Sequence, residues 1–501
     1  MLKFKDVNFD VIGFKSSWKA KSKQSESGSQ TEPLKIEESE TQTIGHDEKE
    51  SQTDPEPKVV VPPADAAVQP SLVAFLGRAV PLVLRELERS EKSRAFDGYQ
   101  LIEEDDDQPV RRLLTLRLAG RPADTGTTGD QVSCLSWSCT GSVVAVGYGA
   151  GEHQSWCEHS TSLALWNVHR KDLNPNQPYQ KLELRSCASY CRFHPSEPSV
   201  LAVGMVTGEL QLYNLSREED PLLGTTSGII QGHREPVSAL HWLARSAGYS
   251  LVSASRDGRM LVWKYSEAKQ QLQLVKQFQL MAGQVPRSAG RRAARADSEA
   301  GLTALAFSHD NPDQFTIGSE GGGVFLCSFA SEVPITAMTG ERTEGLLNPV
   351  TSTFEPHQGQ VLMLQCSKFH RNIFISAGSD NEVRVYNTLQ ISPLLSISLE
   401  AEVTAAALSP SRPLVVFVTT GSGEQHLFDF TRRGAPLHTM RLHEKPLVVT
   451  ALRLNDKQPS LLATGDAKGA VHVWSLATEY VSPKTHELAE INRLGGVQTD
   501  G

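Results

Sequence analysis

Seven segments of the chain repeat one pattern of apolar and polar residues. A typical copy holds an alternating apolar strand, a turn with Pro, Asn or Asp, a strand ending in small residues, a tight turn with Gly, and an apolar strand that closes on an aromatic residue. Alternation with a period of two places every second side chain on one face of a sheet. The copies cover residues 132–168, 188–215, 237–265, 302–329, 361–388, 403–430 and 449–476.

These strands predict an all-β, seven-bladed propeller over residues 111–480. One such sheet cannot bury both of its faces alone, so repeated sheets stack radially and close a ring. Asp257-Gly258 and Thr207-Gly208 supply the positive φ that a two-residue hairpin demands. The strand at 111–118 precedes the first copy and can pair with the last one, closing the ring. We expect the closing aromatic residues to be buried between neighbouring sheets: Trp166, Tyr213, Trp263, Tyr386, Phe428 and Trp474.

The repeat resembles the WD40 family, whose units of about 40–45 residues carry a Gly-His and a Trp-Asp signature. Gly232-His233 matches the first pair, whereas the second pair is worn and is replaced by Cys327-Ser328 in the fourth copy. The other copies carry Trp166-Asn167, Tyr213-Asn214, Trp263-Lys264, Tyr386-Asn387, Phe428-Asp429 and Trp474-Ser475 at that position. The resemblance implies a WD40 propeller.

The chain outside the repeats divides into four segments. Residues 1–69 are rich in Ser, Glu, Lys, Gln, Thr and Pro. Such a mixture cannot bury enough apolar surface to offset the entropy of ordering, so we expect a disordered tail there. We further expect a short amphipathic helix at 70–95, an acidic linker at 96–110 and a C-terminal tail at 481–501.

Apolar residues at 70–95 follow the i, i+3, i+4 spacing of a helix. They are Leu72, Phe75, Leu76, Ala79, Val83, Leu84 and Leu87. Ser71 can serve as the N-cap, whereas Pro81 removes one backbone hydrogen bond and predicts a bent helix or two short ones. Two interpretations stay open: the helix packs back on the ring, or it docks in a groove of a small partner, which we favour.

Three related triplets stand in the polar tail: Ser29-Gln30-Thr31, Thr41-Gln42-Thr43 and Ser51-Gln52-Thr53. In an extended backbone the two hydroxyl residues point one way and Gln the other, which suits a peptide that adds to a sheet edge. The triplets resemble the Lys/Arg-x-Thr/Ser-Gln-Thr motif bound by LC8-type light chains, and the third matches it fully with Lys49. Weak sites in tandem gain from multivalency.

The sequence contains no motif that predicts catalysis. It has no Gly-x-Ser-x-Gly elbow, His-Glu-x-x-His or Cys-x-x-Cys pair. The glycines of 147–151 open no helix and precede no Lys-Ser/Thr, so they indicate a long hairpin turn. Asp257, Asp380 and Asp466 fall in blade turns, where Asp usually braces the backbone. We expect a binding platform that is not an enzyme and holds no cofactor.

The segment GEHQSWCEH offers three side chains of the kind that bind metals: His153, Cys157 and His159. A structural zinc site usually needs four ligands in paired spacings, and the sequence shows no second cluster. We therefore expect a blade-connecting loop here and no metal. The seven cysteines are an odd number and mostly stand in apolar strand patterns, which favours reduced core thiols.

Charge and hydropathy narrow the range of partners. The net charge of -9 gives no case for nucleic-acid binding. We expect no direct membrane insertion, because no stretch approaches the roughly 20 apolar residues of a spanning helix, and the start of the chain does not resemble a signal peptide. Residues 285–295 hold four arginines, which indicate either a solvated loop, the interpretation we favour, or a contact for an acidic partner.

The order of these parts resembles a dynein intermediate chain, and within that family the dynein-2 members of retrograde intraflagellar transport. The likeness is carried by RAFDGYQ (94–100), GSVVAVGYG (141–149), KFHRNIFISAG (368–378) and LLATGDAKGAVHVW (461–474). It implies a non-catalytic motor subunit, with ATP hydrolysis left to the heavy chain.

The resemblance also implies partners and a location. LC8-type light chains would bind the triplets, roadblock-type light chains the helix, and the dynein-2 heavy chain the propeller. A second dynein-2 intermediate chain would pair through the light-chain dimers. The location would be the cytoplasm, the cytoskeleton, the centrosome and the cilium with its axoneme and basal body. The alternative is a WD40 adaptor of another complex, such as a ubiquitin-ligase substrate receptor, which would have no use for the triplets.

Overall fold

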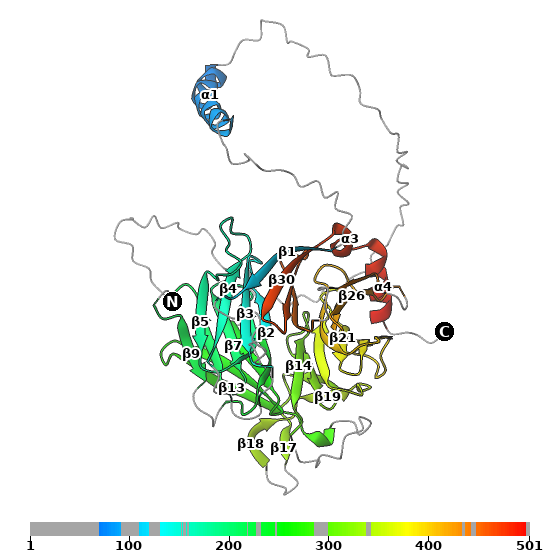
Figure 1. Ribbon diagram of the computed structural model, residues 1–501. Coiled ribbons are helices and arrows are strands. Elements are labelled where there is room, and N and C mark those ends of the chain that lie inside the picture. Colours follow the sequence, from blue (N-terminus) through cyan, green and yellow to red (C-terminus); the bar gives the residue numbers. More distant parts are fainter. Residues whose placement is uncertain are drawn as a thin grey trace, which may run out of the picture. The chain divides into compact units, whose positions relative to one another are not determined.

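The computed structural model describes residues 70–91, 110–119, 131–151, 153, 157, 160–217, 219–226, 232–245, 248–284, 299–336, 342–432, 436–441 and 447–496. The chain divides into two compact units, Met1–Ile102 and Glu103–Gly501. Figure 1 shows the helices and strands of both units.

Helix α1 (Pro70–Glu91) is the described part of the first unit. The helix predicted from the apolar spacing is therefore present. It continues through Pro81 as one element, so the alternative of two short helices does not form. Pro81 is exposed, and water can satisfy the carbonyl that loses its partner there. No described helix is both long and apolar enough to cross a membrane.

The described strands of the second unit form seven four-stranded blades around a ring, which confirms the predicted propeller (Figure 1). Blades 1 to 3 are β2 (Gln131–Trp137), β3 (Val143–Gly149), β4 (Thr161–Asn167) and β5 (Gln180–Leu184); β6 (Ala188–Phe193), β7 (Val200–Met205), β8 (Leu210–Asn214) and β9 (Leu222–Thr226); and β10 (Val237–Arg245), β11 (Gly248–Ser255), β12 (Arg259–Ser266) and β13 (Gln271–Gln279). Blades 4 and 5 are β14 (Leu302–Phe307), β15 (Gln314–Ser319), β16 (Val324–Ser328) and β19 (Val350–Thr353); and β20 (Val361–Cys366), β21 (Ile373–Gly378), β22 (Glu382–Asn387) and β23 (Leu395–Ser398). Blade 6 is β24 (Val403–Leu408), β25 (Val415–Thr420), β26 (Glu424–Asp429) and β27 (His438–Arg441).

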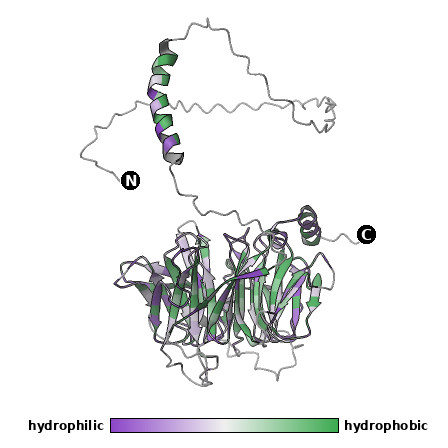
Figure 2. Ribbon diagram, turned by 45° about the horizontal axis from the view of Figure 1, so that its top comes forward, coloured by the Kyte–Doolittle hydropathy of each residue, from purple (hydrophilic) through white to green (hydrophobic). Residues whose placement is uncertain are grey.

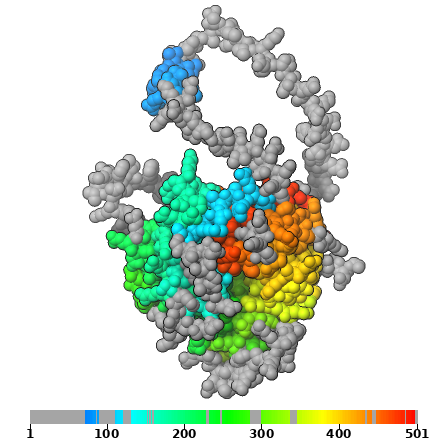
Figure 3. Space-filling view, viewed as in Figure 1, coloured from blue at the N-terminus to red at the C-terminus, as the bar shows by residue number. Residues whose placement is uncertain are grey.

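Blade 7 takes its fourth strand from the N-terminal side of the ring. It consists of β28 (Val449–Leu454), β29 (Leu461–Asp466) and β30 (Ala470–Leu476), and β1 (Val110–Arg117) pairs antiparallel with β30. The sequence predicted this pairing for the strand at 111–118. In Figure 3 the cyan segment of β1 lies against the orange and red C-terminal blade. Closure of this kind leaves no open edge between the two ends of the ring.

A hairpin that the repeat pattern did not predict joins two blades at their outer strands. The short strands β17 (Pro334–Thr336) and β18 (Arg342–Leu347) are inserted between β16 and β19 of blade 4. β18 pairs in parallel with β13 of blade 3 through Gln277 and Phe278. β13 in turn pairs with β9 of blade 2, so hydrogen bonds connect blades 2 and 3 directly.

Apolar layers between neighbouring blades form the core, and Figure 2 shows the apolar residues concentrated along the propeller strands. The closing aromatic residues lie in these layers, as predicted, and all six are buried: Trp166, Tyr213, Trp263, Tyr386, Phe428 and Trp474. Cys327, which replaces an aromatic residue in the fourth copy, is also buried.

The residues expected as a C-terminal tail from 481 onward are partly helical. The short helix α3 (Thr478–Val481) is followed by α4 (Thr485–Gly495). Ile491 and Leu494 of α4 belong to the apolar layer between blades 5 and 6, and Asn387 donates a hydrogen bond to the Leu494 carbonyl at 3.0 Å. Helix α4 forms here because its apolar side chains cover the layer between blades 5 and 6.

Candidate functional site

Blade 3 contains a buried polar network of four side chains. Asp257 accepts hydrogen bonds from His233, whose Nδ1 lies 3.1 Å from Oδ2, and from the backbone N–H groups of Arg234 and Arg259. The second ring nitrogen of His233 lies 2.7 Å from the Ser253 hydroxyl oxygen, which also accepts a hydrogen bond from the Trp263 indole. The network ties the loop before β10 to the β11–β12 turn.

The charge state of Asp257 indicates that this network has a structural role. Burial alone would raise the pKa of the Asp257 carboxyl, but the hydrogen bond and charge of His233 and two backbone N–H groups hold that pKa below its usual value. An ionised carboxylate whose acceptor positions are used within the blade is poorly placed to abstract a proton. The expectation that this Asp braces the turn is confirmed.

Blades 5 and 7 contain similar hydrogen-bond networks at the equivalent positions. In blade 5 the Nδ1 of His357 lies 2.9 Å from an oxygen of Asp380, and its Nε2 lies 2.6 Å from Ser376 Oγ. In blade 7 Asp466 accepts hydrogen bonds from the backbone of the β29–β30 turn, and Trp474 donates to Thr464 at 2.9 Å. The polar residues of these repeats thus stabilise the turns of the blades.

The first strands of the seven blades line a central cavity of ≈ 180 Å³. Arg453 of β28 donates a hydrogen bond to the Tyr190 hydroxyl, and its guanidinium lies 5.2 Å from the centre of that ring. Attraction to Tyr190 outweighs burial and raises the pKa of Arg453. The hydrogen bond between the thiols of Cys134 and Cys191 lowers the pKa of the first and raises that of the second.

These groups do not form a catalytic set. Among the described residues, the cavity brings together no nucleophile, base and orienting group at reacting distance. Arg453 instead links the first strands of the consecutive blades 7, 1 and 2, because it also donates to the Leu135 carbonyl of β2 at 3.4 Å.

The predicted light-chain site on α1 is present as an exposed apolar surface. The large side chains at six of the seven predicted positions are exposed, and Ala79 is half-buried. Val73, Val80 and Leu82, which are not among the seven predicted positions, are exposed as well. At about 100° per residue, these positions span an arc of about 200° around the helix. That arc is wider than a helix needs to pack on one flat surface.

Two other predicted sites lie outside the described residues. The three Ser/Thr-Gln-Thr triplets and Lys49 fall within 1–69, so they stay predictions. The arginines of 285–295 fall within 285–298, between β13 of blade 3 and β14 of blade 4.

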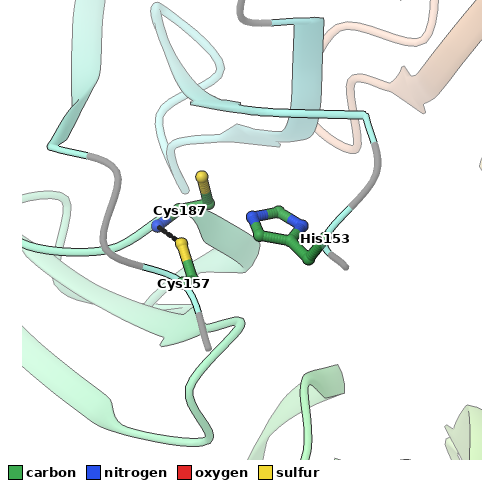
Figure 4. A group of neighbouring side chains, drawn as sticks. All are labelled: His153, Cys157 and Cys187. Atoms are coloured by element: carbon green, nitrogen blue, oxygen red, sulfur yellow. Dashed lines mark hydrogen bonds between the residues drawn. The ribbon is translucent and has the colours of Figure 1, made fainter. Parts of the chain in front are cut away.

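The structure adds one residue to the metal-binding side chains noted in the sequence. The loop between β3 and β4 holds His153 and Cys157, and Cys187 stands directly before β6 of the next blade (Figure 4). Their ligand atoms all lie within 4.8 Å of one another. His159 lies outside the described residues. Sequence reasoning missed Cys187 because only the closed ring brings the two blades together.

Comparisons with known proteins agree with this fold. Residues 224–264 match the family described as WD domain, G-beta repeat. The chain is 38% identical to human cytoplasmic dynein 2 intermediate chain 2 over 442 residues, which cover 87% of this chain and 81% of that protein. It is 37% identical to the mouse protein of the same name over 93% of this chain and 87% of that protein. Human dynein axonemal intermediate chain 2 is 27% identical over 59% of this chain and 45% of that protein.

Fold and site together define a WD-repeat propeller protein that offers surfaces for binding. The extent of identity then shows the family. The chain belongs to the dynein intermediate chains, the non-catalytic WD-repeat subunits of dynein motors.

Proposed function

We propose that this chain is an intermediate chain of a cytoplasmic dynein 2 motor, where it joins light chains to the heavy chain in retrograde intraflagellar transport and cilium assembly. The proposal rests on its similarity to the two cytoplasmic dynein 2 intermediate chains. It implies a location in the cytoplasm and on the cytoskeleton, including the ciliary axoneme, the basal body and the centrosome. A ubiquitin-ligase substrate receptor would not account for this similarity.

The observation that carries the light-chain assignment is the exposed apolar arc of α1. Burying one large apolar side chain stabilises a complex by about 1.5–3 kcal/mol. Leu76, Leu84 and the other large residues of the arc can therefore outweigh the entropic cost of association. An arc of about 200° fits a groove that encloses the helix from several sides, such as one shared by two subunits. We assign this helix to a roadblock-type light-chain dimer.

The other proposed contacts follow the order of segments along the chain. LC8-type light chains, which are dimers, would bind the triplets within 1–69 as added strands, and neighbouring triplets would raise the local concentration of each. The propeller over 111–480 would bind the heavy chain. A second, different intermediate chain would supply the other half of each light-chain site.

A pull-down with purified roadblock-type light chain tests the α1 assignment. Leu76→Asp combined with Leu84→Asp places two charges on the apolar arc, and we expect at least a tenfold loss of light-chain binding. The matched control is Arg78→Asp with Arg85→Asp, which puts the same residue on the opposite side of the helix, and it should retain binding. Unchanged binding by the leucine variant, with unchanged thermal unfolding, would refute the assignment.

Purification of the native complex from ciliated cells tests the wider proposal. We expect the dynein-2 heavy chain, light chains of both types and a second intermediate chain to co-purify. Recovery of a ubiquitin ligase without dynein subunits would favour the alternative adaptor function instead.

A further inference from the structure

The connection between β3 and β4 is much longer than its counterparts in other blades. It runs from 150 to 160, whereas the second and third strands of blades 2, 3 and 5 are joined by 206–209, 256–258 and 379–381. A hairpin of the propeller needs only such a short turn. The longer connection of blade 1 has room for side chains that the short turns of the other blades lack.

Three metal-binding side chains converge at this long connection. His153 and Cys157 come from the connection itself, and Cys187 comes from the link between blades 1 and 2 (Figure 4). The imidazole nitrogen and the two sulfur atoms all lie within 4.8 Å of one another. Both cysteines are nearly inaccessible, with 5% of Cys157 and 1% of Cys187 exposed.

The surrounding backbone donates hydrogen bonds to both sulfur atoms. The N–H of Cys187 donates to Cys157 Sγ at 3.3 Å, the dashed line of Figure 4, and the N–H of Ala150 donates to Cys187 Sγ at 3.4 Å. Backbone donors of this kind commonly surround the cysteine ligands of metal sites. Donors around the first ligands also orient them, as they do in established metal sites.

We propose that His153, Cys157 and Cys187 bind a structural Zn²⁺ ion that joins blade 1 to blade 2. Two thiolates and one imidazole are ligands that Zn²⁺ prefers, whereas Mg²⁺ and Ca²⁺ take oxygen ligands. Tetrahedral zinc with bonds of about 2.0–2.3 Å places its ligand atoms about 3.5–3.8 Å apart, so each separation in the cluster shortens by at most about 1 Å on binding. Water completes the four ligands.

The proposed ion would stabilise a boundary that strand pairing does not cross. Among the described strands, no backbone ladder pairs the sheet of blade 1 with that of blade 2, as at most boundaries of the ring, and Phe193 N–H of β6 donates to Ser136 Oγ of β2 at 3.0 Å. A metal held by ligands from both sides adds a further link across this boundary. Because the ligands meet only in the folded ring, binding adds directly to the stability of the fold.

Metal analysis of the purified full-length chain tests this inference. The protein is loaded with Zn²⁺, passed through a chelating resin and analysed for bound zinc, and we expect about one ion per chain. Cys157→Ser, Cys187→Ser and His153→Gln should each reduce bound zinc at least tenfold. Cys139→Ser is the matched control, since this partly exposed cysteine lies outside the cluster, and it should retain full zinc.

Two further readouts separate zinc loss from misfolding. Chelation of the unmutated chain should lower its thermal unfolding temperature, and added Zn²⁺ should restore it, with no mutation involved. Under partial denaturation, which exposes these otherwise inaccessible cysteines, zinc should also slow the alkylation of Cys157 and Cys187. The proposal is wrong if the loaded chain retains no zinc, if the ligand variants retain as much zinc as Cys139→Ser, or if a Cys157–Cys187 disulfide forms and excludes the metal.

Discussion

Arg412 and Glu487 form an ion pair that is buried from solvent, with 1% and 0% of the two residues exposed. Arg412 lies in the turn before β25 of blade 6, and Glu487 lies in the first turn of α4. The guanidinium Nε donates to both carboxylate oxygens, at 3.0 and 3.3 Å, and Nη2 also donates to Asp429 at 3.1 Å. Arg412 further donates to the Glu479 carbonyl, so one side chain holds both C-terminal helices on the propeller.

The first prediction concerns this pair. Glu487→Ala leaves part of the Arg412 charge buried without its main partner, which typically costs about 3–5 kcal/mol. We expect α4 to detach, with amide hydrogen exchange in the helix faster by about 100-fold or more. The matched control is Glu490→Ala in the same helix, where the pair with Arg493 is largely exposed and is worth at most about 1 kcal/mol. Equal exchange rates in the two variants would contradict a structural role for Glu487.

The second prediction concerns ring closure by β1. Leu116 is 0% exposed and packs between blades 7 and 1, so Leu116→Ala should lower the free energy of unfolding by about 2–5 kcal/mol. Leu113 stands at the irregularity of the same strand and is 45% exposed, so Leu113→Ala should change stability by about 0.5 kcal/mol or less. Chemical denaturation of the full chain measures both, and similar losses would show that β1 does not close the ring through Leu116.

The third prediction is a pH dependence. Burial lowers the pKa of His241 well below its usual value, and the charges of Arg192 and His309 lower it further. As the pH falls through about 6.5, His241 binds a proton in the unfolded chain but stays neutral in the folded chain. The stability of the fold therefore decreases as the pH drops below about 6.5. His241→Gln should remove part of this slope between about pH 6.5 and 5.

Thermal unfolding across this pH range provides the measurement for His241. The control is His169→Gln, which changes an exposed histidine in the β4–β5 connection and should keep the slope of the unmodified chain. If His241→Gln also keeps that slope, the protonation of another group explains the acid sensitivity.

The fourth prediction concerns the triplets of the tail. Changing Gln30, Gln42 and Gln52 together to Ala removes the side chain that faces opposite to the two hydroxyl residues, and we expect LC8-type light chain to be lost from a pull-down. Single changes should have graded effects, with Gln52→Ala the largest, because that triplet alone has the preceding Lys49. Undiminished binding by the triple variant would show that the triplets are not the light-chain site.

Local pattern determined most of the propeller. Strand alternation, turn glycines and closing aromatic residues depend on neighbours close along the chain, so each blade could be recognised from the sequence. The pairing of β1 with the last blade could also be inferred, because a ring of repeats needs a strand to close it. The apolar spacing of α1 was readable for the same local reason, and Pro81 did not override it, since one lost hydrogen bond is small beside a helix of 22 residues.

Only the tertiary structure decided which distant residues meet. Cys187 joins His153 and Cys157 because packing of blade 2 against blade 1 sets their separation, and no spacing along the chain encodes it. Arg412 meets Glu487 because α4 covers the apolar layer of blades 5 and 6, where a buried charge requires a partner. The sequence by itself thus determined the blades, helix α1 and the fold class, but not the β17–β18 hairpin or the helices α3 and α4. The cross-blade contacts came from ring closure, which places side chains from distant parts of the chain at a common boundary.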